Sequence, residues 1–449
     1  MAKKKSEKKL KWWQLSLFGV GCTIGTGFFL GSSIAIRTTG PSILIAFVLA
    51  AIGTYFVFDA LAKMTAKKPE KGAFRTYAKQ AMGRWAGFSI GWIYWSSEML
   101  IMGSQLTALS IFTKFWFPDI PLYIFAAVYA VLGLGVLLIG SNGLSRLENI
   151  FALIKISAIL MFIIIALLAV FGTIDGTRDP QMPADYFPKG IIGLWSAFIF
   201  AFYAFGGIEV MGLMATELKN KNDAPKSGKI MILLLTIIYL LSIGLAVMLV
   251  SWKVFTGEES TFVVALKNYN IPLVADIFNG ALIIGGFSTM VAALFGVTSI
   301  LVSLAEDGDA PRFFAKKGKL KVPLPAFILT ASGLVTSIIL SLLMPDSIYE
   351  YITTGAGLML LYNWLFILLS ANRLLKPGMM DRMKYYMGML LILLAVSGTL
   401  FNKEIRPGFF ISLGFVTIIA IFVLIKRSSW KKEGSAGAGT LFQKLEKQK

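Results

Sequence analysis

Long apolar runs alternate with short polar segments along the whole chain. A helix that crosses a bilayer core about 30 Å thick needs roughly 20 apolar residues. By this measure the pattern predicts twelve membrane-spanning helices, over 14–37, 41–63, 85–113, 121–139, 148–172, 191–216, 228–251, 273–304, 324–344, 347–371, 384–401 and 407–426. We therefore expect an all-α, polytopic membrane protein.

The positions of Lys and Arg predict how these spans are oriented. With a cytoplasmic N-terminus, 34 of the 43 Lys and Arg residues fall in cytoplasmic segments and 8 in outer ones. Cytoplasmic loops of membrane proteins carry this excess of positive charge. The sequence thus predicts a multi-pass protein of the cytoplasmic membrane whose two termini both lie in the cytoplasm. Its N-terminal segment over 1–13 is basic, and its tail over 427–449 is expected to be flexible.

The amino acid composition argues against several kinds of functional site. The mean hydropathy is +0.74, the chain has no His, and Cys22 is its single cysteine. The commonest metal ligand and proton shuttle is therefore missing, and no internal disulfide can form. We find no ATP-binding loop and no pair of nucleophile and base, so we expect neither an enzyme nor a metal or cofactor site. The net charge of +19 follows the loops and does not indicate nucleic acid binding.

Glycine clusters interrupt two of the predicted spans. The first span contains GVGCTIGTGFFLG, in which five of the thirteen residues from Gly19 to Gly31 are glycine. Five spans later, FAFYAFGGIEVMG places Gly206 and Gly207 in a similar position. Close helix packing would explain either cluster alone, whereas an inverted repeat of five spans predicts two broken helices at these places.

Three stretches carry a resemblance to a known family: TIGTGFFLG, FAFYAFGGIEVMGLMATELKNKNDAPKS and TSILVSLAEDGDAPRFFAKKGKLKVPLPAF. The chain resembles the amino acid permeases of the amino acid–polyamine–organocation superfamily. The resemblance implies a LeuT-type fold with repeats over 14–172 and 191–371, helices one and six broken, and two peripheral helices over 384–426. Relatives commonly carry Arg where Ile300 stands, so a gating ion pair made by that Arg is not expected.

The ends of broken helices complement an α-amino acid. Free N–H groups of Gly25, Thr26 and Gly27 can bind its carboxylate. Free carbonyls can take its ammonium group, and we expect them near the residues that end the inner half of span one and precede the break of span six: Gly21, Cys22, Ala201, Tyr203 and Ala204.

Aromatic residues precede the break in span six, where the resemblance implies a lid over the substrate. Of Phe202, Tyr203 and Phe205 we favour Tyr203, whose hydroxyl can also reach a polar partner; the alternative for each is core or lipid-facing packing. Glu209 follows Gly206 and matches an acidic position of the family. It is either a coupling residue or the cap of the half-helix that begins at Gly207.

Lys155 stands inside the fifth predicted span. The resemblance implies that its ammonium group occupies the place where sodium-coupled relatives bind the ion, with Ser288 and Thr289 on the opposite side. The alternative is that its long stem reaches the cytoplasmic surface. We therefore expect no dependence on sodium, with Lys155 either a fixed cation or a group that titrates with coupled protons.

Glu98 falls near the middle of the third span. It either contacts the substrate side chain or accepts a proton, and packing against polar neighbours such as Ser97 is the alternative. Relatives often carry an acid near the position of Gln105 instead.

Two cytoplasmic regions allow more than one interpretation. The stretch AFRTYAKQAMG is either an amphipathic interfacial helix or an ordinary loop. The charged residues at predicted cytoplasmic helix ends form either an inner gate or surface pairs and caps: Arg146, Glu148, Glu306, Asp307, Asp309 and Arg312.

Taken together, the sequence predicts a secondary amino acid transporter that works by alternating access, as a proton symporter or an exchanger. The alternative is an amino acid sensor that uses the same fold.

Overall fold

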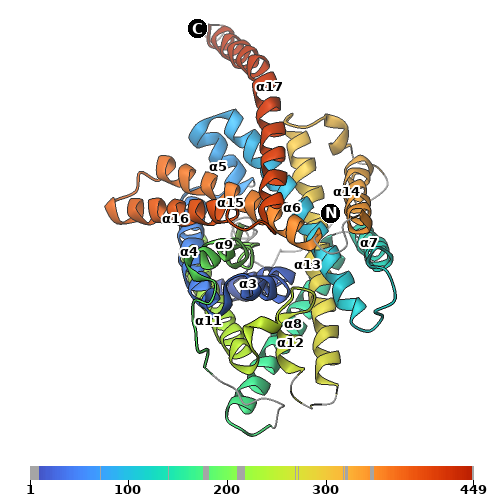
Figure 1. Cartoon of the computed structure of the whole chain (residues 1–449). Helices are drawn as coiled ribbons and strands as arrows, with labels where there is room; N and C mark the ends of the chain where they lie inside the picture. Colours follow the sequence, from blue (N-terminus) through green and yellow to red (C-terminus); the bar gives the residue numbers. More distant parts are fainter. Residues whose placement is uncertain are drawn as a thin grey trace.

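The computed structural model describes residues 10–70, 72–139, 141–174, 182–209, 218–267, 269, 271, 273–316, 318, 322–343 and 348–446. Within these ranges all the regular elements are helices, and an isolated β-bridge joins Leu10 to Leu218. Figure 1 shows the helices gathered in one bundle, beyond which the C-terminal part of α17 projects. The prediction of an all-α, polytopic membrane protein is confirmed.

Each predicted span coincides with helical structure. The helices are α1 (Trp12–Thr23), α2 (Thr26–Phe29), α3 (Gly31–Thr39), α4 (Ile43–Lys67), α5 (Ala73–Met82), α6 (Arg84–Lys114), α7 (Leu122–Ile139), α8 (Ser141–Val170), α9 (Gly190–Tyr203), α11 (Ala224–Leu249), α12 (Thr261–Leu266), α13 (Val274–Glu306), α14 (Leu324–Leu343), α15 (Ile348–Leu374), α16 (Met379–Gly398) and α17 (Arg406–Glu446). By length and apolar composition alone, six helical segments of the described chain can cross a membrane, and three further apolar helices are shorter. The count of twelve spans stays a prediction.

Both predicted interruptions are present. Helix α1 ends at Thr23, Ile24 and Gly25 are extended, and α2 begins at Thr26, so the first break starts slightly before the predicted place. Helix α9 ends at Tyr203 and a turn over 204–207 follows. Gly207 has φ +103°, which a residue with a side chain rarely adopts. Residues 210–217, the rest of the sixth predicted span, lie outside the described chain.

The stretch AFRTYAKQAMG forms α5, and its apolar face is buried in the protein. Phe74, Arg75 and Tyr77 are buried, and α5 packs against α6 and α15. Arg75 donates to Asp307 and Asp309, each at 2.6 Å, in the segment that follows α13. Helix α5 is therefore a packed part of the bundle rather than an exposed loop.

The cluster around Asp309 ties together the ends of three helices. Arg84 at the start of α6 also contacts Asp309, with its Nε 3.2 Å from Oδ1. Glu306 and Arg312 are exposed instead. The side chains of Arg146 and Glu148 lie outside the described part of the chain.

Replacing Asp309 with Ala is expected to lower the thermal stability of the purified protein strongly. Asp309 is 1% exposed and faces both Arg75 and Arg84, and removing one partner of a buried ion pair costs about 3–5 kcal/mol. The melting temperature in detergent measures the effect, with Glu306→Ala as the control at an exposed acid nearby. Equal melting temperatures of the two variants would contradict a structural role for this cluster.

A second ion-pair cluster lies at the opposite end of α4. Arg37, near the end of α3, donates to Glu350 of α15 at 2.7 Å, to Glu404 at 2.9 Å and to the carbonyl of Thr256 at 2.7 Å. Because α4 runs from just after Arg37 to just before Arg75, the two clusters mark the two ends of the bundle.

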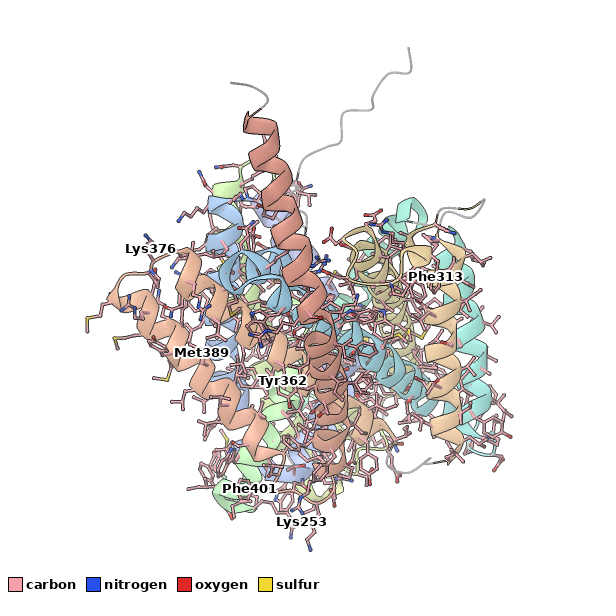
Figure 2. The ribbon with its side chains drawn as sticks, turned by 90° about the horizontal axis from the view of Figure 1, so that it is seen from above. Lys253, Phe313, Tyr362, Lys376, Met389 and Phe401 are labelled. Atoms are coloured by element: carbon pink, nitrogen blue, oxygen red, sulfur yellow. The ribbon has the colours of Figure 1, made fainter. Side chains whose placement is uncertain are left out.

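The loops gather at these two ends. In Figure 2, Lys253 and Phe401 lie at one end of the bundle, and Lys376 and Phe313 lie toward the other. This grouping agrees with the sides that the Lys and Arg pattern assigns to these loops. Which end is cytoplasmic stays a prediction. Helix α17 continues through the predicted tail to Glu446, and the flexibility of that segment is likewise still a prediction.

Candidate functional site

The two helix breaks lie against each other. A β-carbon added at Gly207 would lie 3.4 Å from the carbonyl oxygen of Cys22, at the end of α1. A β-carbon added at Gly27 would lie 2.7 Å from Cδ1 of Tyr203, at the end of α9. A side chain at Gly27 would therefore separate the two segments, whereas at Gly207 the contact is an ordinary one and the positive φ is what favours glycine.

The outer piece of the first span presents unpaired backbone donors to this region. Helix α2 begins at Thr26 with Gly25 as its N-cap. The first N–H groups that form hydrogen bonds within it are those of Phe28 and Phe29, which both donate to the carbonyl of Gly25. Within the described chain, the N–H groups of Gly25, Thr26 and Gly27 have no hydrogen-bond partner. These are the groups that the sequence predicts for carboxylate binding.

Three neighbouring helices hold α2 in place. The hydroxyl of Thr26 donates to Oε1 of Gln105 in α6 at 2.6 Å, and that of Thr289 in α13 donates to the same oxygen at 3.0 Å. The hydroxyl of Tyr349 in α15 donates to the carbonyl of Thr26 at 3.0 Å. The amide nitrogen of Gln105 faces the break, 3.4 Å from a β-carbon built on Gly25. The sequence reading did not assign Gln105 or Tyr349 to the site; the one available signal was a polar residue in the middle of an apolar span.

Replacing Gln105 with Leu is expected to weaken amino acid binding about tenfold to a hundredfold. The change keeps the size of the side chain but removes the acceptor of the buried Thr26 hydroxyl, at a cost of about 1–3 kcal/mol. Equilibrium binding of a radiolabelled substrate to the purified protein measures the effect. Thr107→Val is the matched control, because that hydroxyl bonds only the carbonyl of Gly103 within its own helix. Wild-type affinity in Gln105→Leu would remove this residue from the site.

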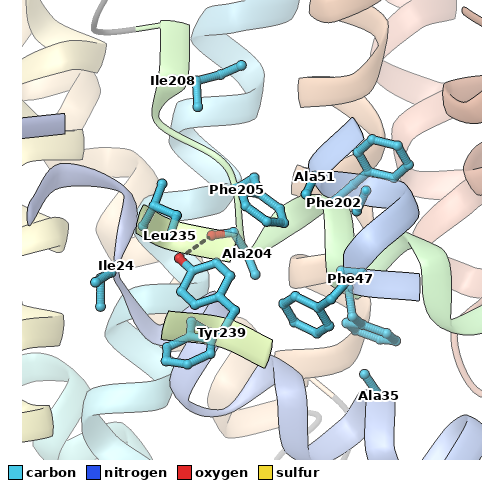
Figure 3. Close-up of a cluster of buried hydrophobic side chains, with 14 of the residues drawn as sticks. Ile24, Ala35, Phe47, Ala51, Phe202, Ala204, Phe205, Ile208, Leu235 and Tyr239 are labelled. Atoms are coloured by element: carbon cyan, nitrogen blue, oxygen red, sulfur yellow. Dashed lines mark hydrogen bonds between the residues drawn. The ribbon is translucent and has the colours of Figure 1, made fainter. Parts of the chain in front are cut away.

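Of the three aromatic candidates, Tyr203 faces the first break. Its ring lies over Gly27, and its hydroxyl is 2.7 Å from that of Ser104 in α6. Phe202 instead meets Trp364 edge-on with ring centroids 6.2 Å apart. Phe205 points toward Phe47 and Tyr239, as Figure 3 shows. The structure therefore brings the ring of Tyr203 to the first break and packs those of Phe202 and Phe205 in the core, and the role of each in substrate binding stays a prediction.

The turn after α9 is anchored on both sides. The carbonyl of Ala204 accepts a hydrogen bond from the hydroxyl of Tyr239 at 2.8 Å, drawn as the dashed line in Figure 3. Ala201 is buried one turn earlier in α9, and a β-carbon added at Gly206 would lie 3.0 Å from Leu360. The turn is thus packed from α11 and α15 and is not a loose loop.

Lys155 is buried between α1 and α13. Its Nζ donates to the carbonyl of Gly21 at 3.2 Å, and its Cγ lies 3.0 Å from a β-carbon built on Gly285. The side chain is 1% exposed, so it does not reach the surface. Ser288, one turn after Gly285, is buried with a hydroxyl that has no partner among the described residues. The Gly21 carbonyl, a candidate for the ammonium group, therefore already accepts one hydrogen bond, from Lys155.

Glu209 closes the turn at the second break. Its Oε1 accepts from the N–H of Gly207 and its Oε2 from the indole of Trp364 in α15, both at 3.2 Å.

Glu98 lies about two helical turns before Gln105 in α6 and is therefore not at the level of the membrane span where Gln105 contacts α2. In the part of the chain that the structure describes, no group of three or more Cys, Asp or Glu side chains could hold a metal ion.

Known proteins match the chain over most of its length. The model of the amino acid permease family matches residues 14–430. The chain is 57% identical over 437 residues to the uncharacterized transporter YcgH of Bacillus subtilis, covering 96% of this chain and 97% of that protein. It is also 30% identical over 375 residues to the aromatic amino acid transport protein AroP of Corynebacterium glutamicum, covering 81% and 80% of the two chains. The protein thus belongs to the amino acid permease family and is a multi-pass membrane transporter, not an enzyme.

Proposed function

We propose that this permease carries an α-amino acid by alternating access, with its substrate held between the two helix breaks. The observation that carries the proposal is the contact of the breaks, with Gly207 against the Cys22 carbonyl and Gly27 under the Tyr203 ring. Opened backbone inside a membrane is tolerated where it lines a binding site, and here two such segments meet.

In this proposal the backbone recognises the part common to all α-amino acids. The unpaired N–H groups of Gly25, Thr26 and Gly27 bind the carboxylate, aided by the dipole of the helical piece that they begin. The carbonyl of Cys22 and those near the end of α9, at Ala201 and Tyr203, take the ammonium group. A carbonyl oxygen that already accepts one hydrogen bond keeps a second lone pair for this purpose.

The proposal includes the architecture that the resemblance implies. The inverted repeats cover 14–172 and 191–371, helices over 384–426 are peripheral, and both termini lie in the cytoplasm. Two breaks five predicted spans apart and the distribution of Lys and Arg support this arrangement.

We propose further that transport is independent of sodium and proceeds by proton symport or by exchange. The support is Lys155, whose ammonium group lies at the Gly21 carbonyl between α1 and α13. A resident cation there leaves no need for a metal ion at the same carbonyl. In the proposal Ser288 faces this region from α13, whereas the hydroxyl of Thr289, the other predicted residue, is turned to Gln105 at the first break.

Uptake by proteoliposomes tests the function. The panel includes aromatic amino acids, threonine, serine and γ-aminobutyric acid, because relatives are named as an aromatic amino acid transporter, a probable threonine/serine transporter and a γ-aminobutyric acid permease. Each is assayed with a proton gradient, a sodium gradient or neither, against empty liposomes. We expect uptake of at least one amino acid without sodium. If no amino acid moves, the transporter proposal is wrong and the sensor alternative is favoured.

A further inference from the structure

Two buried carboxyl groups lie close together next to the second break. Glu98 of α6 is 7% exposed and Glu209 is fully buried. The two interact electrostatically, and Tyr94, one turn before Glu98, donates a hydrogen bond to Glu98 and lies in the field of both carboxyls. Two interacting carboxylates that are both buried in a medium of low dielectric cannot both be ionised at little cost, so such a pair retains a proton.

Among the described residues, none of the groups that interact with Glu98 is basic. The helices with the most extensive contacts to α6 are α13 and α15, and their charged residues lie near their ends: Asp276, Glu306, Glu350 and Arg373. From α5, Arg75 faces the same helix but is engaged by Asp307 and Asp309. The groups that act on the Glu98 carboxyl are Glu209 and Tyr94, and Tyr203 is the further titratable group that interacts with it.

Hydrogen bonds distinguish the two carboxyls. Each oxygen of Glu209 accepts from an N–H donor, the backbone of Gly207 and the indole of Trp364. Such donors favour the ionised form of a carboxyl. The Tyr94 hydroxyl donates to Glu98, so among the described residues Glu98 has one such donor against the two N–H donors of Glu209. The retained proton therefore belongs on Glu98.

We propose that Glu98 and Glu209 form a carboxyl pair that holds one proton, carried by Glu98, and that this proton is taken up and released during the transport cycle. The proposal deepens the proposed function and rests on it for the coupling, although not for the proton itself. Glu98 receives the proton from one aqueous phase and becomes neutral. It returns to the carboxylate when the proton leaves to the other phase.

The pair is connected to the substrate site through the second break. Glu209 holds the N–H of Gly207, which in turn lies against the Cys22 carbonyl. Next to Glu98, Ser97 donates to the carbonyl of Ala356 in α15 at 3.2 Å. Ionising Glu98 would place a second anion beside Glu209, whose hydrogen bonds hold the turn. The charge on Glu98 and the shape of the break are therefore linked.

Infrared difference spectroscopy tests the proton without any transport. The purified protein is titrated, and the C=O stretching band of a protonated carboxyl is followed. We expect the wild type to show such a band at neutral pH, Glu98→Gln to lose it, and Glu306→Gln, the same change at an exposed helix end, to keep it. A band that persists in Glu98→Gln but disappears in Glu209→Gln would overturn the assignment, as would a wild type without the band.

Transport by the same variants tests the coupling. In proteoliposomes with a pH-sensitive dye inside, wild type and Glu306→Gln should accumulate substrate against its gradient when the outside is acidic. Glu98→Gln should only equilibrate the substrate and move no protons, whereas Glu98→Asp should keep proton movement and show that the fold tolerates a change here. Accumulation by Glu98→Gln equal to that of the wild type would overturn the coupling. If the wild type moves no amino acid, the transporter proposal fails while the infrared band still decides whether Glu98 holds a proton.

Discussion

Replacing Gly27 with Val is expected to abolish amino acid uptake while the protein still reaches the membrane. Even the first carbon of the new side chain would lie 2.7 Å from the Tyr203 ring, much closer than carbon atoms approach without overlap. Either α2 or the end of α9 must then move, and both breaks contribute to the proposed site. Overpacking of this kind costs about 1–3 kcal/mol, so Gly27→Ala should already weaken substrate binding about tenfold or more.

The control for this prediction lies four residues further along the same segment. A β-carbon added at Gly31 has no neighbouring atom within 4 Å, so Gly31→Ala should transport like the wild type. Uptake of the labelled substrate, normalised to the amount of protein in the membrane, measures both variants. Undiminished uptake by Gly27→Val would show that the contact between the breaks is not needed for transport.

Replacing Lys155 with Met is also expected to abolish transport. The variant keeps much of the apolar stem but removes the ammonium group from the carbonyl of Gly21, at the last turn of α1. Lys155→Arg should not restore full activity, because the Cγ already lies 3.0 Å from where a β-carbon on Gly285 would stand. The planar guanidinium group needs more room than an ammonium group.

Uptake rates in sodium chloride and in choline chloride test whether transport depends on sodium. The wild type should transport equally in both salts. Lys155→Gln keeps a polar group of similar length and serves as the matched variant for the loss of charge. Stimulation of the wild type by sodium would contradict the role of Lys155 as the resident cation, and normal uptake by Lys155→Met would show that the charge has no part in transport.

Most of the fold could be predicted from the sequence because membrane spans leave a strong signal. Twenty apolar residues in a row have few alternatives in a bilayer, so each predicted span coincides with helical structure. Glycine pairs also have few uses inside such a span, and both breaks were predicted within two residues. The packing of α5 could not be predicted, because its buried partner Asp309 lies more than two hundred residues away in the chain.

The candidate site was predictable only in its backbone part. Positions of N–H and carbonyl groups follow from where a helix opens, and Gly25, Gly27 and Gly207 mark those points. Side-chain directions depend on helix rotation, so the sequence could not separate Tyr203, which faces α2, from Phe202 and Phe205, which face the core. Gln105 was missed as a site residue for the same reason.

The two ion-pair clusters at the ends of the bundle respond differently to salt. At one end Arg75 and Asp309 are both nearly buried, whereas at the other the side chains of Arg37 and Glu404 are 33% and 62% exposed. Mobile ions screen exposed charges over about 8–10 Å at ordinary salt concentrations and act far less on buried ones. Rising ionic strength is therefore expected to weaken the ion pairs at the Arg37 end more than those at the Arg75 end, and under the proposed alternating access this difference would make opening at the Arg37 end easier in high salt.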